Sequence, residues 1–306
     1  MKWYKENLDL SSSILGLEGA EIYKNDENLK PSWVEAPVVN SEFHIKRNKD
    51  NILVVIGESW TYGESLGNIA TGLKKYDLLS QLQYCFGVKM SITLNFDYFQ
   101  YAVPGNCNAN MYIELPRILK YITANFNYKN IFLVTQLTEP SRESAILNEL
   151  PKHPVTALYK NKKPIKFEDW LLRYDEVFLD IISEEVEKYK NIKTVVWKNF
   201  CKFLNKKIYN NLQLIETSWI EYSAKFLGKQ YETLSFQSIR WLDSIMKESN
   251  KNNIQFDISW ISDEINKIEK SNEFISNNFL HNNHPNEIAH ILWAQYLLLE
   301  TGWQNE

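Results

Sequence analysis

The stretch Asn51-Ile-Leu-Val-Val-Ile-Gly-Glu-Ser-Trp-Thr-Tyr-Gly63 decides the fold. Its first half is a short, continuous apolar run, which is typical of a central parallel strand buried on both faces of a sheet. The run stops at Gly57, and polar residues follow at once. Because the functional crevice of an open parallel sheet lies at the carboxyl ends of its strands, Ser59 is predicted at such a crevice.

Outward from this stretch, apolar strand patterns alternate with amphipathic helix patterns. Strands are predicted at 99–103, 130–135 and 192–197, and helices at 66–86, 109–126 and 167–189. This alternation implies right-handed βαβ units. The predicted fold is a three-layer α/β sandwich with a mainly parallel, flavodoxin-like sheet covered by helices on both faces.

Two regions interrupt the alternation. Residues 1–48 are polar and lack sustained periodicity, which predicts an N-terminal arm that packs on the body or on a partner. Residues 199–278 show helical pieces and no clear buried strand, and they are predicted to be an insertion or cap. The remaining chain over 49–306 is predicted to form one α/β domain around this insertion.

The final helix is delimited by residues typical of helix ends. Asn283 or His284 is expected to cap it, Pro285 to occupy its first turn, and Gly302 to end it. Its apolar residues recur on one helical face, which predicts the buried side: Ile288, Leu292, Tyr296 and Leu299.

Composition excludes several classes of partner. The 306 residues carry a net charge of -4, which provides no basic surface to attract nucleic acid or an anionic membrane. No stretch approaches the roughly 18 apolar residues of a membrane span, and the N-terminus lacks the apolar core of a cleaved signal. A soluble, cytoplasmic protein is expected. The three cysteines, Cys85, Cys107 and Cys201, are expected to be buried free thiols.

Two residues are candidates for a nucleophile and its general base. Ser59 lies between Gly57 and Gly63, where the next helix directs backbone N–H groups toward developing negative charge, although a serine there also simply initiates helices. His284 opens the final helix and is placed to act as a general base, while a capping or packing role is the alternative. We expect Ser59 to be an exposed nucleophile whose replacement by alanine leaves the thermal midpoint nearly unchanged.

Taken together, these segments resemble the SGNH (GDSL-type) hydrolases. The segments Gly57-Glu-Ser-Trp-Thr61 and His284-Pro-Asn286, the latter with His290 six residues after His284, are similar to the first and last blocks of that family. The segment 102–108 is similar to the second block, and 134–142 occupies the position of the third. The resemblance implies attack by Ser59, proton transfer to His284, and N–H groups of Ser59 and Gly105 around the oxyanion.

The reaction that this resemblance implies is hydrolysis of an acyl ester of a small molecule or glycan, without a metal or cofactor. Three positions depart from the family pattern. Glu58 replaces the usual Asp, Gln136 and Thr138 stand where an Asn supplies an oxyanion donor, and His281 stands at the triad-acid position. Loss of one oxyanion donor costs about 3 kcal/mol, and loss of the triad acid about ten-thousand-fold in rate.

The departures keep a second interpretation open. A protein with this body and no catalysis would serve as a structural or binding subunit, with protein partners on the arm or the 199–278 region. The segments after Ser59 and Leu137 also resemble SGNH-type proteins of bacteriophages, so a virion component is one form of this alternative. A flavodoxin-like nucleotide binder would need a phosphate loop, and the glycine spacing matches none.

The histidines and aromatic residues near the predicted site allow two further interpretations. His281, His284 and His290 suggest metal ligation, but carboxylates nearby are few and His290 is expected to point away, so no metal is predicted. Four aromatic residues flank the predicted crevice and are expected mainly to pack in the core rather than to stack on a sugar. They are Trp60, Tyr62, Tyr98 and Tyr101.

Overall fold

The protein was studied as a computed structural model. The structure describes residues 3–6, 16–25, 41–63, 66, 82–103, 107–138, 165–199, 203, 207–219, 222, 256–257, 280–281 and 284–305. Most of the helix predicted at 66–86 lies outside these residues, as do Gly105 and Cys201.

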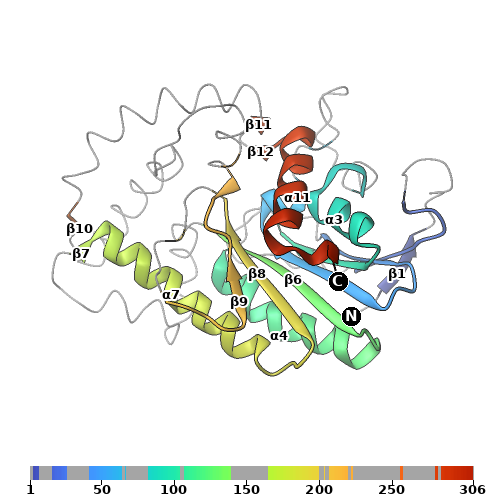
Figure 1. The fold of residues 1–306 in the computed structure, drawn as a ribbon, viewed down its shortest axis with the longest axis horizontal. Coiled ribbons are helices and arrows are strands. Elements are labelled where there is room, and N and C mark those ends of the chain that lie inside the picture. Colours follow the sequence, from blue (N-terminus) through green and yellow to red (C-terminus); the bar gives the residue numbers. More distant parts are fainter. Residues whose placement is uncertain are drawn as a thin grey trace.

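An eight-stranded sheet forms the centre of the molecule (Figure 1). Its spatial order is β1-β2-β3-β5-β4-β6-β8-β9, and the strands from β5 to β9 run parallel to one another. Strands β1 to β3 extend this parallel part with antiparallel pairs. The bounds are β1 Trp3–Glu6, β2 Glu21–Asn25, β3 Ser41–Lys46, β4 Asn51–Gly57, β5 Asp97–Ala102, β6 Asn130–Leu137, β8 Ile192–Lys198 and β9 Leu212–Leu214.

Helices cover both faces of this sheet. The bounds are α1 Ser59–Tyr62, α3 Phe86–Leu94, α4 Asn108–Asn125, α7 Phe167–Val186 and α11 Glu287–Thr301, followed by the 3-10 helix η2 Trp303–Asn305. Helices α3 and α11 pack on one face, and α4 and α7 on the other (Figure 1). The predicted three-layer α/β fold with a mainly parallel sheet is therefore confirmed.

The alternation of side chains explains the continuous apolar run of β4. Ile52, Val54 and Ile56 join the core under α4 and α7, whereas Leu53 and Val55 join the core under α3 and α11. A strand covered on both faces has no solvent side, so every position favours an apolar residue. Strand β4 thus contributes side chains to the hydrophobic cores on both faces of the sheet.

The chain path makes the end of β4 a topological switch point. From β4 the chain passes through α3 to β5 on one side, and then through α4 to β6 on the other side. The two connections leave on opposite faces, so they separate above the carboxyl end of β4. Crevices of open parallel sheets form at such points, and the residues after Gly57 lie there.

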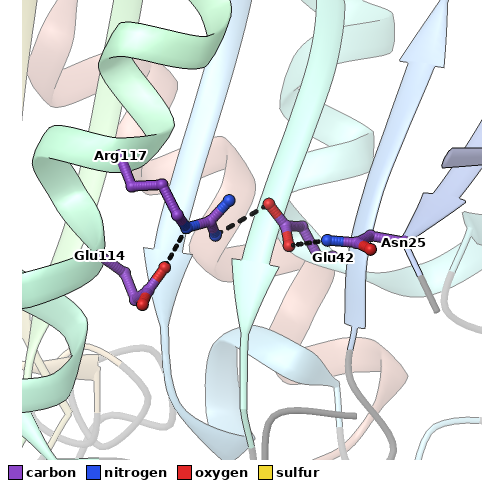
Figure 2. Close-up of polar contacts among 4 residues, drawn as sticks. All are labelled: Asn25, Glu42, Glu114 and Arg117. Atoms are coloured by element: carbon purple, nitrogen blue, oxygen red, sulfur yellow. Dashed lines mark hydrogen bonds and ion pairs between the residues drawn. The ribbon is translucent and has the colours of Figure 1, made fainter. Parts of the chain in front are cut away.

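Part of the predicted arm builds the antiparallel extension. Figure 2 shows how it is fixed to the body: Arg117 of α4 bonds to Glu42 of β3 with an Nη2–Oε1 distance of 2.9 Å, and it also pairs with Glu114. Asn25 of β2 donates to the other oxygen of Glu42 at 2.7 Å. Burial raises the pKa of Glu42, and the guanidinium of Arg117 opposes that rise. The buried carboxylate therefore joins two strands to a helix.

The final helix differs from its prediction in two ways. Its N-cap is Asn286, whose Oδ1 accepts from the N–H of Ala289 at 3.0 Å, and Pro285 precedes it in β12. Ile288 and Leu299, predicted to be buried, are 58% and 69% exposed. The helix is apolar on more than one side, so periodicity alone did not identify its inward face, which consists of Ala289, His290, Trp293, Ala294, Leu297 and Leu298. Gly302 ends the helix with φ 66°, as predicted.

Three short strands lie in or near the region predicted as an insertion or cap. Strand β9 pairs in parallel with β8 at the edge of the sheet, and of its residues only Leu212 is buried. Strand β10 (Phe256–Asp257) pairs with β7 (Ile165–Lys166). The rest of 199–278 is mostly outside the described residues, and its role as an insertion or cap stays a prediction.

Cys85 and Cys107 are both buried, as expected, and Cys85 is a free thiol. Burial raises the pKa of the Cys85 thiol to about 11. Among the helices that the structure describes, none has both the length and the apolar character needed to cross a bilayer.

Candidate active site

Gly57 allows the end of β4 to close tightly on its neighbours. A Cβ atom at this position would lie 2.0 Å from Thr61 Oγ1 and 2.6 Å from Gln136 Oε1. Real Cβ atoms do not approach other atoms so closely, so a side chain here would displace both groups. The absence of a side chain therefore lets α1 and β6 meet directly above the strand.

Glu58 is the centre of a buried polar network at this point. Its side chain is fully buried and caps α1, and five described donors reach its carboxylate. These donors are Ser59 N at 2.7 Å, Ser59 Oγ, Trp60 N at 3.2 Å, Gln136 Nε2 at 2.8 Å and Asn199 Nδ2 at 3.5 Å. All five partners donate, which matches an acceptor-only carboxylate. Glu58, which stands where the family pattern has Asp, is therefore the common partner of the described polar groups at the end of β4.

Ser59 begins α1 directly after the switch point, but it is 1% exposed. Its hydroxyl donates to Glu58 Oε2, and its N–H donates to the same oxygen. The expectation of an exposed nucleophile is therefore wrong. The Glu58 side chain turns back over the first turn of α1, where its carboxylate accepts from the Ser59 hydroxyl.

The two residues predicted in place of an oxyanion Asn lie at the end of β6. Gln136 donates to Glu58, while its Oε1 accepts from Glu58 N at 3.2 Å and Thr61 Oγ1 at 2.7 Å. Thr138 N donates to Asn108 Oδ1 at 2.8 Å, and Asn108 Nδ2 donates to Thr138 O at 3.0 Å. The Gln136 amide and the Thr138 N–H therefore already serve protein acceptors.

His284 lies in β12 (His284–Pro285), which pairs antiparallel with β11 (Leu280–His281), and His281 is the register partner of His284. Backbone Cα atoms of β12 lie within 8 Å of both α1 and α11. The chain therefore brings the His284 segment against the helix that begins at Ser59. The catalytic roles of Ser59, His284 and the oxyanion residues, and the place of His281 as triad acid, remain predictions, as does the contribution of Gly105.

His290 occupies the core rather than a ligand position. Its Nδ1 accepts from Phe86 N at 3.2 Å, and its ring stacks on Phe86 and meets the edge of Trp219. In the described parts of the chain, no group of three His, Cys, Asp or Glu residues is arranged to hold a metal ion. The four aromatic residues flanking the crevice are also buried, which supports the core-packing interpretation of Trp60, Tyr62, Tyr98 and Tyr101.

The end of β8 carries polar residues that the sequence reading missed. Lys198 Nζ bonds both oxygens of Asp175 on α7, at 3.0 and 2.9 Å, and both side chains are buried. Burial raises the pKa of Asp175, and the Lys198 charge opposes that rise. Asn199 follows and reaches Glu58. A sequence signal was available for both asparagines, because Asn199 directly follows β8 and Asn108 begins the helix after β5, and the carboxyl ends of parallel strands share one edge of the sheet.

No protein-family model matches the sequence, and no curated protein matches it. Solved structures of low similarity include a protein described as a GDSL-like lipase from Parabacteroides merdae, with 17% identity, 83% of this chain and 97% of that chain covered, and a TM-score of 0.37. A catalytic mutant of an acetylxylan esterase from Geobacillus stearothermophilus has 12% identity, coverage of 83% and 95%, and a TM-score of 0.35.

A family two carbohydrate esterase from Clostridium thermocellum, solved with cellohexaose, has 12% identity. The alignment covers 85% of this chain and 67% of that chain, with a TM-score of 0.39. At TM-scores this low the likenesses assign no activity to this chain.

Proposed function

We propose that the protein is a serine ester hydrolase that acts on an acyl ester of a small molecule or glycan. One observation carries the proposal: the β12 segment with His284 packs against α1, which begins at Ser59 above the switch point of the sheet. Two segments distant in sequence, one with a candidate nucleophile and one with a candidate base, thus lie near each other at the carboxyl end of β4, where open parallel sheets form their crevices.

In the proposed reaction Ser59 Oγ attacks the acyl carbonyl while His284 accepts the hydroxyl proton. The acyl group passes to Ser59, and His284 returns the proton to the leaving alcohol. Water then releases the acid by the same steps in reverse order. Backbone N–H groups of Ser59 and Gly105, with Gln136 or Thr138, are the proposed donors to the oxyanion.

The test is hydrolysis of p-nitrophenyl acetate by the wild type and Ser59→Ala. We expect wild-type turnover and a fall to the background rate in the variant. Because Ser59 is buried and bonded to Glu58, the variant should also lose about 1 to 2 kcal/mol of unfolding free energy, measured by urea denaturation. Equal rates in the two proteins would contradict the assignment of Ser59.

A second candidate function is a non-catalytic binding or structural subunit with this body, such as a virion component. The observation that favours it is the closed state of the site, in which the Ser59 hydroxyl, the Ser59 N–H and the Gln136 amide all bond to Glu58. This candidate predicts no wild-type turnover on short-chain acyl esters and stable association with other chains.

A further inference from the structure

Glu58 Oε2 binds the two groups of Ser59 that the proposed reaction uses. The hydroxyl would become the nucleophile, and the N–H would donate to the oxyanion, yet both donate to this one oxygen. A hydroxyl has a single proton, so while Glu58 holds that proton no other base receives it. The Ser59 N–H likewise points at a protein carboxylate rather than at a substrate oxygen.

The surroundings of Glu58 favour this closed arrangement. Oε1 accepts from Trp60 N, Gln136 Nε2 and Asn199 Nδ2, so the carboxylate is held from several directions and is itself fully buried. Hydrogen bonds to ionised groups are stronger than neutral ones, and more so away from water. Ser59 Oγ therefore faces an acceptor held by several other donors, so the two separate by rotation of the Ser59 side chain about its Cα–Cβ bond.

We propose that Glu58 is a positioning residue that keeps Ser59 in a closed resting state, and that Ser59 Oγ must rotate away from Glu58 before it attacks an acyl carbonyl. The reaction-rate part of this inference rests on the proposed hydrolase function, whereas the restraint on Ser59 does not. A net bond of this kind shifts the population of the open state by about tenfold to 100-fold. Because only the open state reacts, the observed kcat is reduced by the same factor.

The variant that tests the restraint is Glu58→Asp. Aspartate remains a favoured N-cap for α1, but its carboxylate ends one C–C bond earlier, about 1.5 Å short of the present position. It therefore releases Ser59 Oγ while the cap is retained. We expect kcat on p-nitrophenyl acetate to rise about tenfold with KM changed by less than about twofold, because a population of open enzyme is gained rather than a substrate contact.

A double-mutant cycle in urea unfolding measures the restraint without any turnover. Ser59→Ala should raise the equilibrium constant for unfolding about tenfold in the wild type and have little effect in the Glu58→Asp background. The matched control is Ser91→Ala: Ser91 is equally buried, and its Oγ donates to Val88 O at 2.9 Å, away from Glu58. The control should show equal effects in both backgrounds.

The outcomes separate the two proposals. Coupling between Glu58 and Ser59 with faster turnover in Glu58→Asp supports both. Coupling with no turnover in any variant supports the restraint on Ser59 and removes the hydrolase function. Absence of coupling, or a kcat of Glu58→Asp at or below the wild-type value in an active protein, overturns the closed resting state.

Discussion

Strands β3 and β4 belong to the same sheet and are separated only by β5, yet β4 buries apolar residues along its length whereas β3 buries polar residues among its apolar ones. Strand β4 is apolar from Ile52 to Ile56, and its polar residues begin only after Gly57. Strand β3 buries Glu42 and His44 within its length. The parallel strand therefore concentrates its polar groups at the carboxyl end, whereas the antiparallel strand distributes them along the chain.

The partners of these polar groups differ as well. Glu42 is held by Asn25 and Arg117, and His44 by Tyr128, so each buried group of β3 has its own partners. The described donors at the end of β4 share Glu58 instead. Substitutions in the β3 region should thus have separate effects on stability, while those at the end of β4 should be coupled and should also change activity.

The largest effect on stability is expected for Arg117→Met. Glu42 is fully buried, so removal of the guanidinium leaves an uncompensated carboxylate and costs about 3 to 4 kcal/mol of unfolding free energy. Urea denaturation measures the loss. The matched control adds Glu42→Gln, which removes the stranded charge and should recover part of it. A loss below about 1 kcal/mol would erase the contrast with β4.

A somewhat smaller effect is expected from pH through His44. Burial lowers the pKa of His44 from 6.5 to about 4. As the pH falls, His44 therefore binds a proton near pH 6.5 in the unfolded chain but only near pH 4 in the folded chain. The free energy of unfolding is thus highest above pH 6.5 and decreases as the pH falls from about 6.5 to about 4. The loss approaches about 3 kcal/mol. Over this pH range, the free energy of unfolding of His44→Gln should fall by about 3 kcal/mol less than that of the wild type. An equal fall in both proteins would contradict the lowered pKa of His44.

The smallest loss, about 2 kcal/mol, is expected for Gly57→Ala, because its Cβ would displace Thr61 Oγ1 and Gln136 Oε1. Unlike Arg117→Met, this substitution should also change kcat in an active protein, since it shifts the groups that hold Glu58. Circular dichroism against urea and steady-state kinetics provide the two measurements. Unchanged kcat with reduced stability would mean that substitutions at the end of β4, like those in β3, affect stability alone.

The apolar core strands could be predicted from the sequence, whereas strand β3 with its buried polar residues could not. The core strands and the helices α4 and α7 were predicted within a few residues of their observed ends, because apolar runs and amphipathic periods report burial directly. Strand β3 was missed because buried Glu42 and His44 interrupt its apolar pattern. Their burial depends on Arg117 and Tyr128, which are distant in sequence.

For the candidate site, sequence located Ser59 at the end of β4 because position along a parallel strand determines which edge a residue reaches. It did not predict that Ser59 is covered, since that depends on the reach of the Glu58 side chain. It also assigned the wrong cap to α11: Asn286 was as good a candidate as Asn283, and only backbone geometry separates them. The fold class could therefore be predicted from the sequence, but the local hydrogen bonds of the site and of the helix cap could not.

The two outermost strands of the sheet have a consequence for solubility during expression and storage. Strand β1 has four residues, two of them charged, and β9 has three. Lys5 of β1 also pairs with Glu21 of β2. Strands this short, or this charged, offer a poor template for strand addition by another molecule. A wide sheet rich in aromatic residues is thereby protected against edge-to-edge assembly, the first step toward fibrillar aggregates.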